Sequence, residues 1–240
     1  MWQSPRKSEK STCSLFHQIG WNHWPIGDFI FLLLITVWTN KGDTMDTASD
    51  PCNQIVPGLW IGSLNSLRTI NQDIPGTKQW VVITILSNEK LIAISKILIA
   101  SSPALIGCRH EVWKISDSCQ EDFLSKRLDS LLNLIDESMP STSFSASKTD
   151  ASSAPNKACL VHCAQGVSRS AAVCAAWLIS RRKLSLQDAL AKIRSCRKRI
   201  SPNLGFVASL RALEQSDGDV RKAMERLTRK EDEAKSKPTV

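Results

Sequence analysis

Residues 160–170, with the sequence Leu-Val-His-Cys-Ala-Gln-Gly-Val-Ser-Arg-Ser, place a thiol and a guanidinium at the two ends of a short loop. An apolar run at residues 158–161 precedes this loop, and a helical pattern at residues 170–180 follows it. A strand, a tight loop and a helix in this order make a geometry that binds a phosphate dianion. Cys163 is then a candidate nucleophile toward phosphate, and Arg169 is a candidate phosphate ligand.

Cleavage of a phosphate ester by a thiol requires a thiolate, donors to the phosphate oxygens and an acid for the leaving group. Backbone N–H groups at a helix N-terminus, together with a nearby cation, favour the thiolate form of a cysteine. Arg169 can donate two parallel hydrogen bonds to phosphate oxygens, which a lysine cannot do. Gly166 permits a tight turn. The predicted phosphate-binding residues are Ala164, Gln165, Gly166, Val167, Ser168 and Arg169.

Two further residues of the loop have predicted catalytic roles. We expect His162 to orient the thiolate through hydrogen bonding, and Ser170 to donate to the sulfur and ease its departure from a phosphocysteine. A bare Cys-x5-Arg spacing is weak support in a chain with eight cysteines. The full His-Cys-x-x-Gly-x-Ser-Arg-Ser string between a strand and a helix is a specific pattern. The alternative interpretation is a buried cysteine beside an ordinary turn.

The composition narrows the class of protein and its partners. The 240 residues suit one compact domain with extensions, and the net charge of +8 favours anionic partners, such as nucleic acid, phosphorylated protein or an acidic membrane face. The basic clusters are not interleaved with aromatic residues, so single-stranded nucleic acid is not indicated. The cysteines lie far apart, and Cys159 and Cys174 fall in apolar runs that predict burial, which argues against a disulfide framework and favours a reducing compartment. No pair has CxxC spacing, which argues against a zinc site.

An alternation of strand-like and helix-like segments predicts an α/β domain that positions the loop. The predicted strands are residues 55–62 (a strand pair with a Pro-Gly turn), 80–86, 111–115 and 158–161. The predicted helices are residues 63–71, 121–139, 170–180, 185–197 and 203–214, and residues 91–100 fit either class. Ser185 has capping-box spacing, and Ser201 followed by Pro202 is predicted to cap the last helix of the core.

Three segments lie outside this pattern. Residues 1–50 are predicted to be a disordered extension or a gene-model artefact with the true start at Met45; their apolar run at residues 29–37 is short for a membrane span but suits a signal-peptide core. Residues 140–157 are rich in Ser, Thr and Ala and are predicted to form a flexible insertion. Residues 216–240 are predicted to be a charged tail, with Val220, Met224 and Leu227 on one face.

The loop and its surroundings resemble the dual-specificity branch of the cysteine-dependent protein tyrosine phosphatases. HCAQGVSRSAAVCAAWL is similar to the signature loop and following helix of that branch, IVPGLWIGS to its opening strand pair, and the segment ending in Ser-Pro-Asn-x-Gly-Phe to its closing helices. The resemblance covers about residues 54–215 and implies a small, atypical member. It further implies a single domain of the tyrosine phosphatase fold, with a mixed, mostly parallel sheet of about five strands flanked by helices. By position, Cys163 is the nucleophile and Arg169 the phosphate clamp.

The resemblance also implies an aspartate general acid on a loop after a strand. Val-Trp-Lys-Ile-Ser-Asp ends at Asp117, which matches that place. Asp117 must be protonated when it acts, whereas Cys163 must be ionised. The alternative carboxylate is Asp122, which ranks lower because it falls in the predicted helix start, where an acidic residue serves the helix dipole. Asp117 itself has a plain helix N-cap as its structural alternative.

The resemblance and the loop composition together predict the substrate. The chain has no tyrosine and no Trp-Pro-Asp acid loop, which favours a shallow pocket that accepts phosphotyrosine, phosphoserine and phosphothreonine. Ala164, Gln165 and Val167 are uncharged, unlike the lysines with which phosphoinositide-cleaving relatives meet extra phosphates. A non-catalytic phospho-binding scaffold and a lipid or RNA phosphatase are the alternatives. The expected partners are phosphorylated proteins and protein kinases, without nucleic acid, membrane insertion, metal or cofactor, in the cytoplasm or nucleus.

Two basic clusters have two open interpretations. Residues 181–183 (Arg-Arg-Lys) and 197–199 (Arg-Lys-Arg) suit nuclear import or docking to acidic partners. The alternative is that each is the solvated end of a helix, which is the commoner reason for such a cluster.

Overall fold

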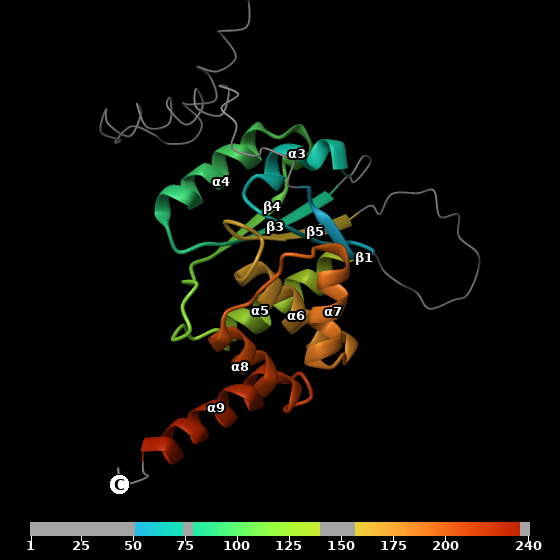
Figure 1. The fold of residues 1–240 in the computed structure, drawn as a ribbon. Coiled ribbons are helices and arrows are strands. Elements are labelled where there is room, and N and C mark those ends of the chain that lie inside the picture. Colours follow the sequence, from blue (N-terminus) through green and yellow to red (C-terminus); the bar gives the residue numbers. More distant parts are fainter. Residues whose placement is uncertain (1–50, 74–78, 140–156, 236–240) are drawn as a thin grey trace, which may run out of the picture. The chain divides into compact units, whose positions relative to one another are not determined.

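A five-stranded mixed sheet forms the centre of the protein (Figure 1). The structure is a computed structural model and describes residues 51–73, 79–139 and 157–235. The strand order is β1-β2-β5-β3-β4, in which β1 and β2 are antiparallel and the other pairs are parallel. The strands are β1 Asn53–Val56, β2 Leu59–Gly62, β3 Gln79–Ile85, β4 Arg109–Trp113 and β5 Lys157–His162. This confirms the predicted α/β class and the mostly parallel sheet.

The strand sequences explain this arrangement. β3 is a continuous β-branched and apolar run because helices cover both faces of the sheet, as is usual for parallel strands. Val82 lies in the core on one face, and Ile83 lies in the core on the other. The predicted strand pair at residues 55–62 is confirmed, and Gly58 makes its turn with a positive φ of 87°, which glycine adopts without strain.

Helices cover the two faces of the sheet in separate layers (Figure 1). One face carries α3 and α4, and the other carries α5, α6, α7 and α8, with α9 packed on α8 and α5. Their bounds are α3 Ser66–Asp73, α4 Glu89–Ser101, α5 Lys126–Ser138, α6 Arg169–Arg182, α7 Leu186–Cys196, α8 Leu204–Glu214 and α9 Val220–Lys235, with a short 3₁₀ helix at Pro103–Leu105. Residues 91–100, which fitted helix or strand, are helical.

The helix α6 lies at the centre of its layer. Every side chain from Ser170 to Ser180 is buried, and α5, α7 and α8 all contact this helix. Four of these residues are alanines, whose small side chains allow neighbouring helices to approach closely. The burial of α6 fixes the position of its N-terminus, where the Cys163 loop ends.

Two predicted helix starts are wrong. The helix expected from residue 121 begins at Lys126, because Ser125 caps it and accepts a hydrogen bond from the Leu128 N–H. Phe123 and Leu124 fit the helical spacing but are buried within the preceding loop. The last core helix is capped by Asn203, whose side chain accepts from the Phe206 N–H, and not by Ser201.

Of the three segments outside the α/β pattern, the structure describes only the C-terminal one. Residues 1–50 and 140–156 lie outside the described residues. The segment predicted to be a charged tail contains the helix α9, in which Val220 and Ala223 are buried and Met224 and Leu227 pack against the core. In the parts of the chain that the structure describes, none of the helices has the length and apolar character that crossing a membrane requires.

Candidate active site

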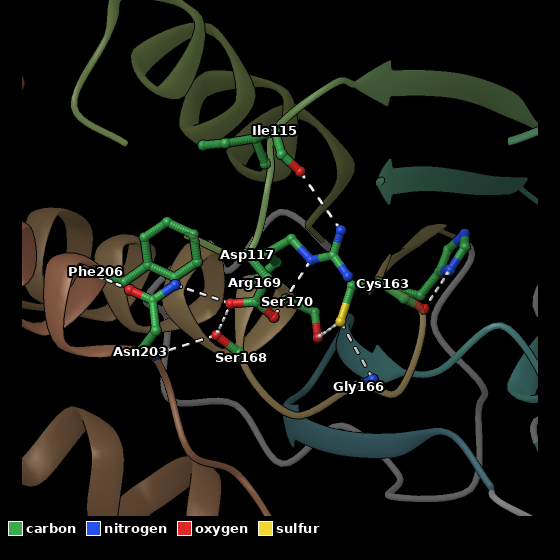
Figure 2. Close-up of polar contacts among 10 residues, drawn as sticks. Ile115, Asp117, Cys163, Gly166, Ser168, Arg169, Ser170, Asn203 and Phe206 are labelled. Atoms are coloured by element: carbon green, nitrogen blue, oxygen red, sulfur yellow. Dashed lines mark hydrogen bonds and ion pairs between the residues drawn. The ribbon is translucent and has the colours of Figure 1, made fainter. Parts of the chain in front are cut away.

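Cys163 lies at the floor of the loop that joins β5 to α6 (Figure 2). Its side chain is 2% exposed, and its Sγ accepts a hydrogen bond from the Gly166 N–H at 3.2 Å. The Ser170 Oγ, one residue inside α6, is 3.3 Å from the same sulfur. The sulfur therefore lies beside the N-terminus of a buried helix and contacts both a backbone and a hydroxyl donor, which stabilise a thiolate.

Gly166 is the point at which the loop requires glycine. Its φ is +67°, in the left-handed region. A Cβ there would lie 2.6 Å from the Gly62 carbonyl oxygen and 2.5 Å from Arg197 Nη2. The close packing of the loop on the end of β2 therefore fixes the direction of the Gly166 N–H toward the sulfur.

The carboxylate of Asp117 reaches this loop from the segment after β4. Its Oδ1 accepts a hydrogen bond from the Ser168 hydroxyl at 2.6 Å and one from the Asn203 side-chain amide at 2.8 Å. Its Oδ2 lies 3.6 Å from Arg169 Nε. Asp117 therefore caps no helix, since Ser125 has that role for α5. The sequence pattern indicated a role only for the backbone of Ser168 and gave no indication of Asn203.

Asp122 does not lie where the sequence prediction put it. It is an exposed residue of the loop between β4 and α5, outside the helix. The stated reason for ranking it below Asp117, a place in the first turn of a helix, is therefore wrong. The hydrogen bonds that Asp117 accepts from Ser168 and Asn203 are the observation that favours it over Asp122 as the general acid.

Arg169 is the first residue of α6, and its guanidinium lies between the acid and the nucleophile (Figure 2). Its Nη1 is 3.5 Å from the Ile115 carbonyl oxygen, to which it donates, and its Nε is paired with Asp117. These contacts hold the guanidinium over the loop, where its charge can meet a dianion.

His162 is fully buried at the end of β5 and takes part in a chain of hydrogen bonds. Its Nδ1 is 3.3 Å from the Cys163 carbonyl oxygen, and its Nε2 is 2.7 Å from Thr84 Oγ1. The same hydroxyl is 2.8 Å from the His110 Nε2. Burial lowers the pKa of His162 to about 4, and burial and the Lys96 charge lower the pKa of His110.

The donors in this chain follow from its acceptors. A carbonyl only accepts, so His162 Nδ1 carries the hydrogen, and in the neutral ring Nε2 must accept from the Thr84 hydroxyl. The Thr84 oxygen then accepts from His110 Nε2–H. Neither Thr84 nor His110 was among the residues predicted from the sequence, although Thr84 is the single polar residue of the run at residues 80–86.

The start of α8 is held against the acid loop by close backbone packing. Gly205 permits this, because a Cβ at that position would overlap the backbone of Cys119. Asn203, two residues earlier, is thereby brought to Asp117. Residue 205 must be glycine for a steric reason, since no side chain fits between these two segments.

The other buried cysteines differ from Cys163 in their surroundings. Cys159 and Cys174 are fully buried, as predicted, and burial raises the pKa of both thiols. Both thiols therefore stay protonated at neutral pH. Within the described residues, no cluster of three or more His, Cys, Asp or Glu side chains is arranged to hold a metal ion.

The first residue of the basic cluster at residues 197–199 is not solvated, as the helix-end interpretation would have it. Arg197 is 4% exposed and donates hydrogen bonds to the loop, whereas Arg199 is exposed. In the other cluster, Arg181 pairs with Asp136, with 2.6 Å between Nε and Oδ2. The burial of Arg197 rules out a docking role for that side chain.

Residues 106–216 match a protein family described as dual specificity phosphatase, catalytic domain. Over this segment the chain is similar to the catalytic domain of dual specificity phosphatases. Mouse dual specificity phosphatase 28 is 50% identical over 58 residues, which are 24% of this chain and 36% of that protein. Human dual specificity protein phosphatase 22 is 26% identical over 165 residues, 69% of this chain and 74% of that protein. The chain thus spans about a third of the length of the first of these relatives.

Solved structures of dual specificity phosphatases share the fold. The crystal structure of human DUSP28 has a TM-score of 0.51 at 24% identity and covers 69% of this chain and 94% of that one. The crystal structure of DUSP15 has a TM-score of 0.52 at 20% identity and covers 74% and 97%. These likenesses confirm the predicted tyrosine phosphatase-like fold.

Proposed function

We propose that this protein hydrolyses phosphotyrosine and phosphoserine or phosphothreonine in proteins through a phosphocysteine intermediate. The observation that carries the proposal is the meeting of Cys163, Arg169 and Asp117 at one loop, with the Gly166 N–H and the Ser170 hydroxyl on the sulfur. The same loop is open to a dianion through backbone donors and a guanidinium.

In the first step, the Cys163 thiolate attacks phosphorus, an S–P bond forms and the P–O bond to the leaving group breaks. Asp117 gives its proton to the departing oxygen. Because Oδ1 already accepts from Ser168 and Asn203, Oδ2 is the oxygen that carries this proton. Arg169 binds two phosphate oxygens in the transition state.

In the second step, water attacks phosphorus and gives a proton to the Asp117 carboxylate. The S–P bond breaks, and its electron pair returns to the sulfur as a thiolate. The Ser170 hydroxyl at 3.3 Å donates to that sulfur and stabilises its negative charge. Inorganic phosphate leaves and the enzyme is regenerated.

The uncharged loop interior supports a protein substrate. The side chains of Ala164, Gln165 and Val167 offer no cation to a second phosphate on an inositol ring. The partners we propose are therefore phosphorylated proteins. A thiolate nucleophile also requires a reducing compartment, such as the cytoplasm or nucleus.

The test is hydrolysis of p-nitrophenyl phosphate, and of peptides with phosphotyrosine or phosphothreonine, by the full chain under reducing conditions. Cys163→Ser should abolish turnover and retain phosphate binding, and Asp117→Ala should lower kcat about 10²–10⁴-fold. Cys108→Ser is the matched control and should keep full activity, because Cys108 immediately precedes β4 and Asp117 follows the other end of that strand. Turnover by the Cys163→Ser variant, or no turnover by the wild type on any of these substrates, would contradict the proposal.

A further inference from the structure

Four consecutive carbonyl groups of the loop, those of residues 164–167, each accept a hydrogen bond from a residue outside the loop. The Ala164 carbonyl accepts from the Leu64 N–H at 3.1 Å, and the Val167 carbonyl accepts from the Ser201 N–H at 2.9 Å. Backbone groups of neighbouring segments hold these two. The two carbonyls between them, of Gln165 and Gly166, are held by arginine side chains.

Arg197 is the side chain that holds both central carbonyls. Its Nε donates to the Gly166 carbonyl at 2.8 Å, and its Nη2 donates to the Gln165 carbonyl at 3.1 Å. Its Nη1 donates to the Asn53 Oδ1 at 2.8 Å and to the Pro51 carbonyl at 3.3 Å. The guanidinium is thus tied to the segment around the start of β1 on one side and to the loop on the other.

The planarity of the peptide bond converts these contacts into an orientation of the amides. In a trans peptide, the carbonyl of one residue and the N–H of the next point in opposite directions. The Gln165 carbonyl belongs to the same plane as the Gly166 N–H, which donates to Cys163 Sγ at 3.2 Å. The Gly166 carbonyl belongs to the same plane as the Val167 N–H. By holding both carbonyls outward, Arg197 directs both N–H groups inward.

We propose that Arg197 is a positioning residue that sets the amide donors of the oxyanion site by fixing these two peptide planes. The contact is tight, because a Cβ on Gly166 would lie 2.5 Å from Arg197 Nη2. Burial of a guanidinium is costly without such hydrogen bonds. This inference rests on the proposed function, since it names what organises the phosphate site.

Arg199 offers a matched comparison. Its Nη2 also donates to the Gln165 carbonyl, at 2.9 Å, but the side chain is exposed. Arg197 is buried and donates to the carbonyls of both planes. A loss of one shared, exposed donor should therefore disturb the site far less than a loss of the buried one.

The experiment measures tungstate binding by calorimetry, together with kcat and KM, for the full chain and its variants. Arg197→Met should weaken tungstate binding about tenfold or more, which corresponds to about 1.4 kcal/mol, and should lower kcat. Arg197→Lys, which keeps the charge but can hold only one plane, should recover part of both. Arg199→Met should change the tungstate affinity and kcat by less than about twofold relative to the wild type.

A merely structural role would lower the melting temperature of the Arg197 variants without changing tungstate binding by the folded protein, and that result overturns the inference. If Arg197→Met does not fold, Asn53→Ala removes an anchor of the guanidinium without touching the loop and should give a smaller loss of tungstate binding. An unchanged affinity in both Arg197→Lys and Asn53→Ala also overturns it.

The two proposals fail separately. A wild type that binds tungstate but turns over no phosphate ester contradicts the proposed function, while the comparison of tungstate affinities still decides the role of Arg197. A wild type with normal turnover and Arg197 variants with normal affinity contradicts the inference alone. A wild type that does not bind tungstate overturns both.

Discussion

Asp117 presents its two carboxylate oxygens to different partners. Ser168 and Asn203 donate to Oδ1, whereas Oδ2 lies toward Arg169. The acid is therefore oriented by residues that themselves have no contact with the leaving group. This division predicts a specific effect of Ser168 on proton donation.

Ser168→Ala should lower kcat about tenfold, less than the roughly 10²–10⁴-fold that loss of the acid itself costs, because the carboxyl group remains and only its orientation is weakened. The loss should be larger with phenyl phosphate than with p-nitrophenyl phosphate, since a more basic leaving group depends more on the proton. The measurement is kcat for both substrates at one pH. Ser118→Ala, in the loop that carries Asp117, is the control. An equal loss with both substrates would show that Ser168 does not act through Asp117.

At this scale the sequence predicted side chains with strong local patterns and missed those that act at a distance. Cys163, Arg169 and Asp117 follow strands in the chain, so their spacing indicates their place. Arg197 and Asn203 belong to later segments, and only the packing of α7 and α8 on the loop brings them there. A residue's burial cannot be deduced from a basic triplet, because the triplet is equally common on solvated helix ends.

At the scale of elements, three parallel strands are tied by polar side chains, which lie near the carboxyl ends of β5 and β3 and near the amino end of β4. His162 of β5, Thr84 of β3 and His110 of β4 form one chain of hydrogen bonds across the sheet. His162 is neutral in this chain, because burial lowers its pKa to about 4. The folded state is therefore sensitive to acid at this position.

The free energy of unfolding should fall by about 2 kcal/mol from this residue between pH 7.5 and pH 5. An unfolded histidine has a pKa of about 6.5, so below that pH the unfolded state binds more protons, and the stability present at neutral pH is lost as pH falls toward 4. Urea unfolding at both pH values measures it. His162→Asn should remove this contribution of about 2 kcal/mol to the pH dependence of the unfolding free energy, whereas His110→Asn should retain it. The same pH dependence in wild type and His162→Asn would refute the assignment.

Element boundaries were less predictable than the elements. The run at residues 80–86 is long, apolar and β-branched, so β3 was evident. Phe123 and Leu124 have helical spacing but are buried in a loop, because α5 begins only after the Ser125 cap. Periodicity reports which residues are buried and does not by itself report the backbone that buries them.

At the scale of the whole molecule, the C-terminal helix α9 is part of the packed core. Val220 and Ala223 are buried, and Met224 and Leu227 pack on the same cluster. The composition of this segment is dominated by charge, which led to its prediction as a tail. Its narrow apolar stripe outweighs the charge because only one face of a helix must be buried.

Ala223→Asp should destabilise the protein by about 3 kcal/mol, because it places a carboxylate among apolar side chains. Thr228→Asp, at an exposed position of the same helix, should change stability by less than about 0.5 kcal/mol. Thermal unfolding and urea titration of both variants check this. Equal stabilities of the two variants would show that α9 does not belong to the cooperative unit.

The loop that joins β5 to α6 offers its inward N–H groups from the main chain, and its carbonyls are held outward by Leu64, Arg197, Arg199 and Ser201. Main-chain donors are the same for every amino acid except proline. The side chains at 164, 165 and 167 are therefore free to change without altering the atoms proposed to hold phosphate. Saturation libraries at these three positions are a route to new substrate preferences, whereas the glycine between them admits no replacement.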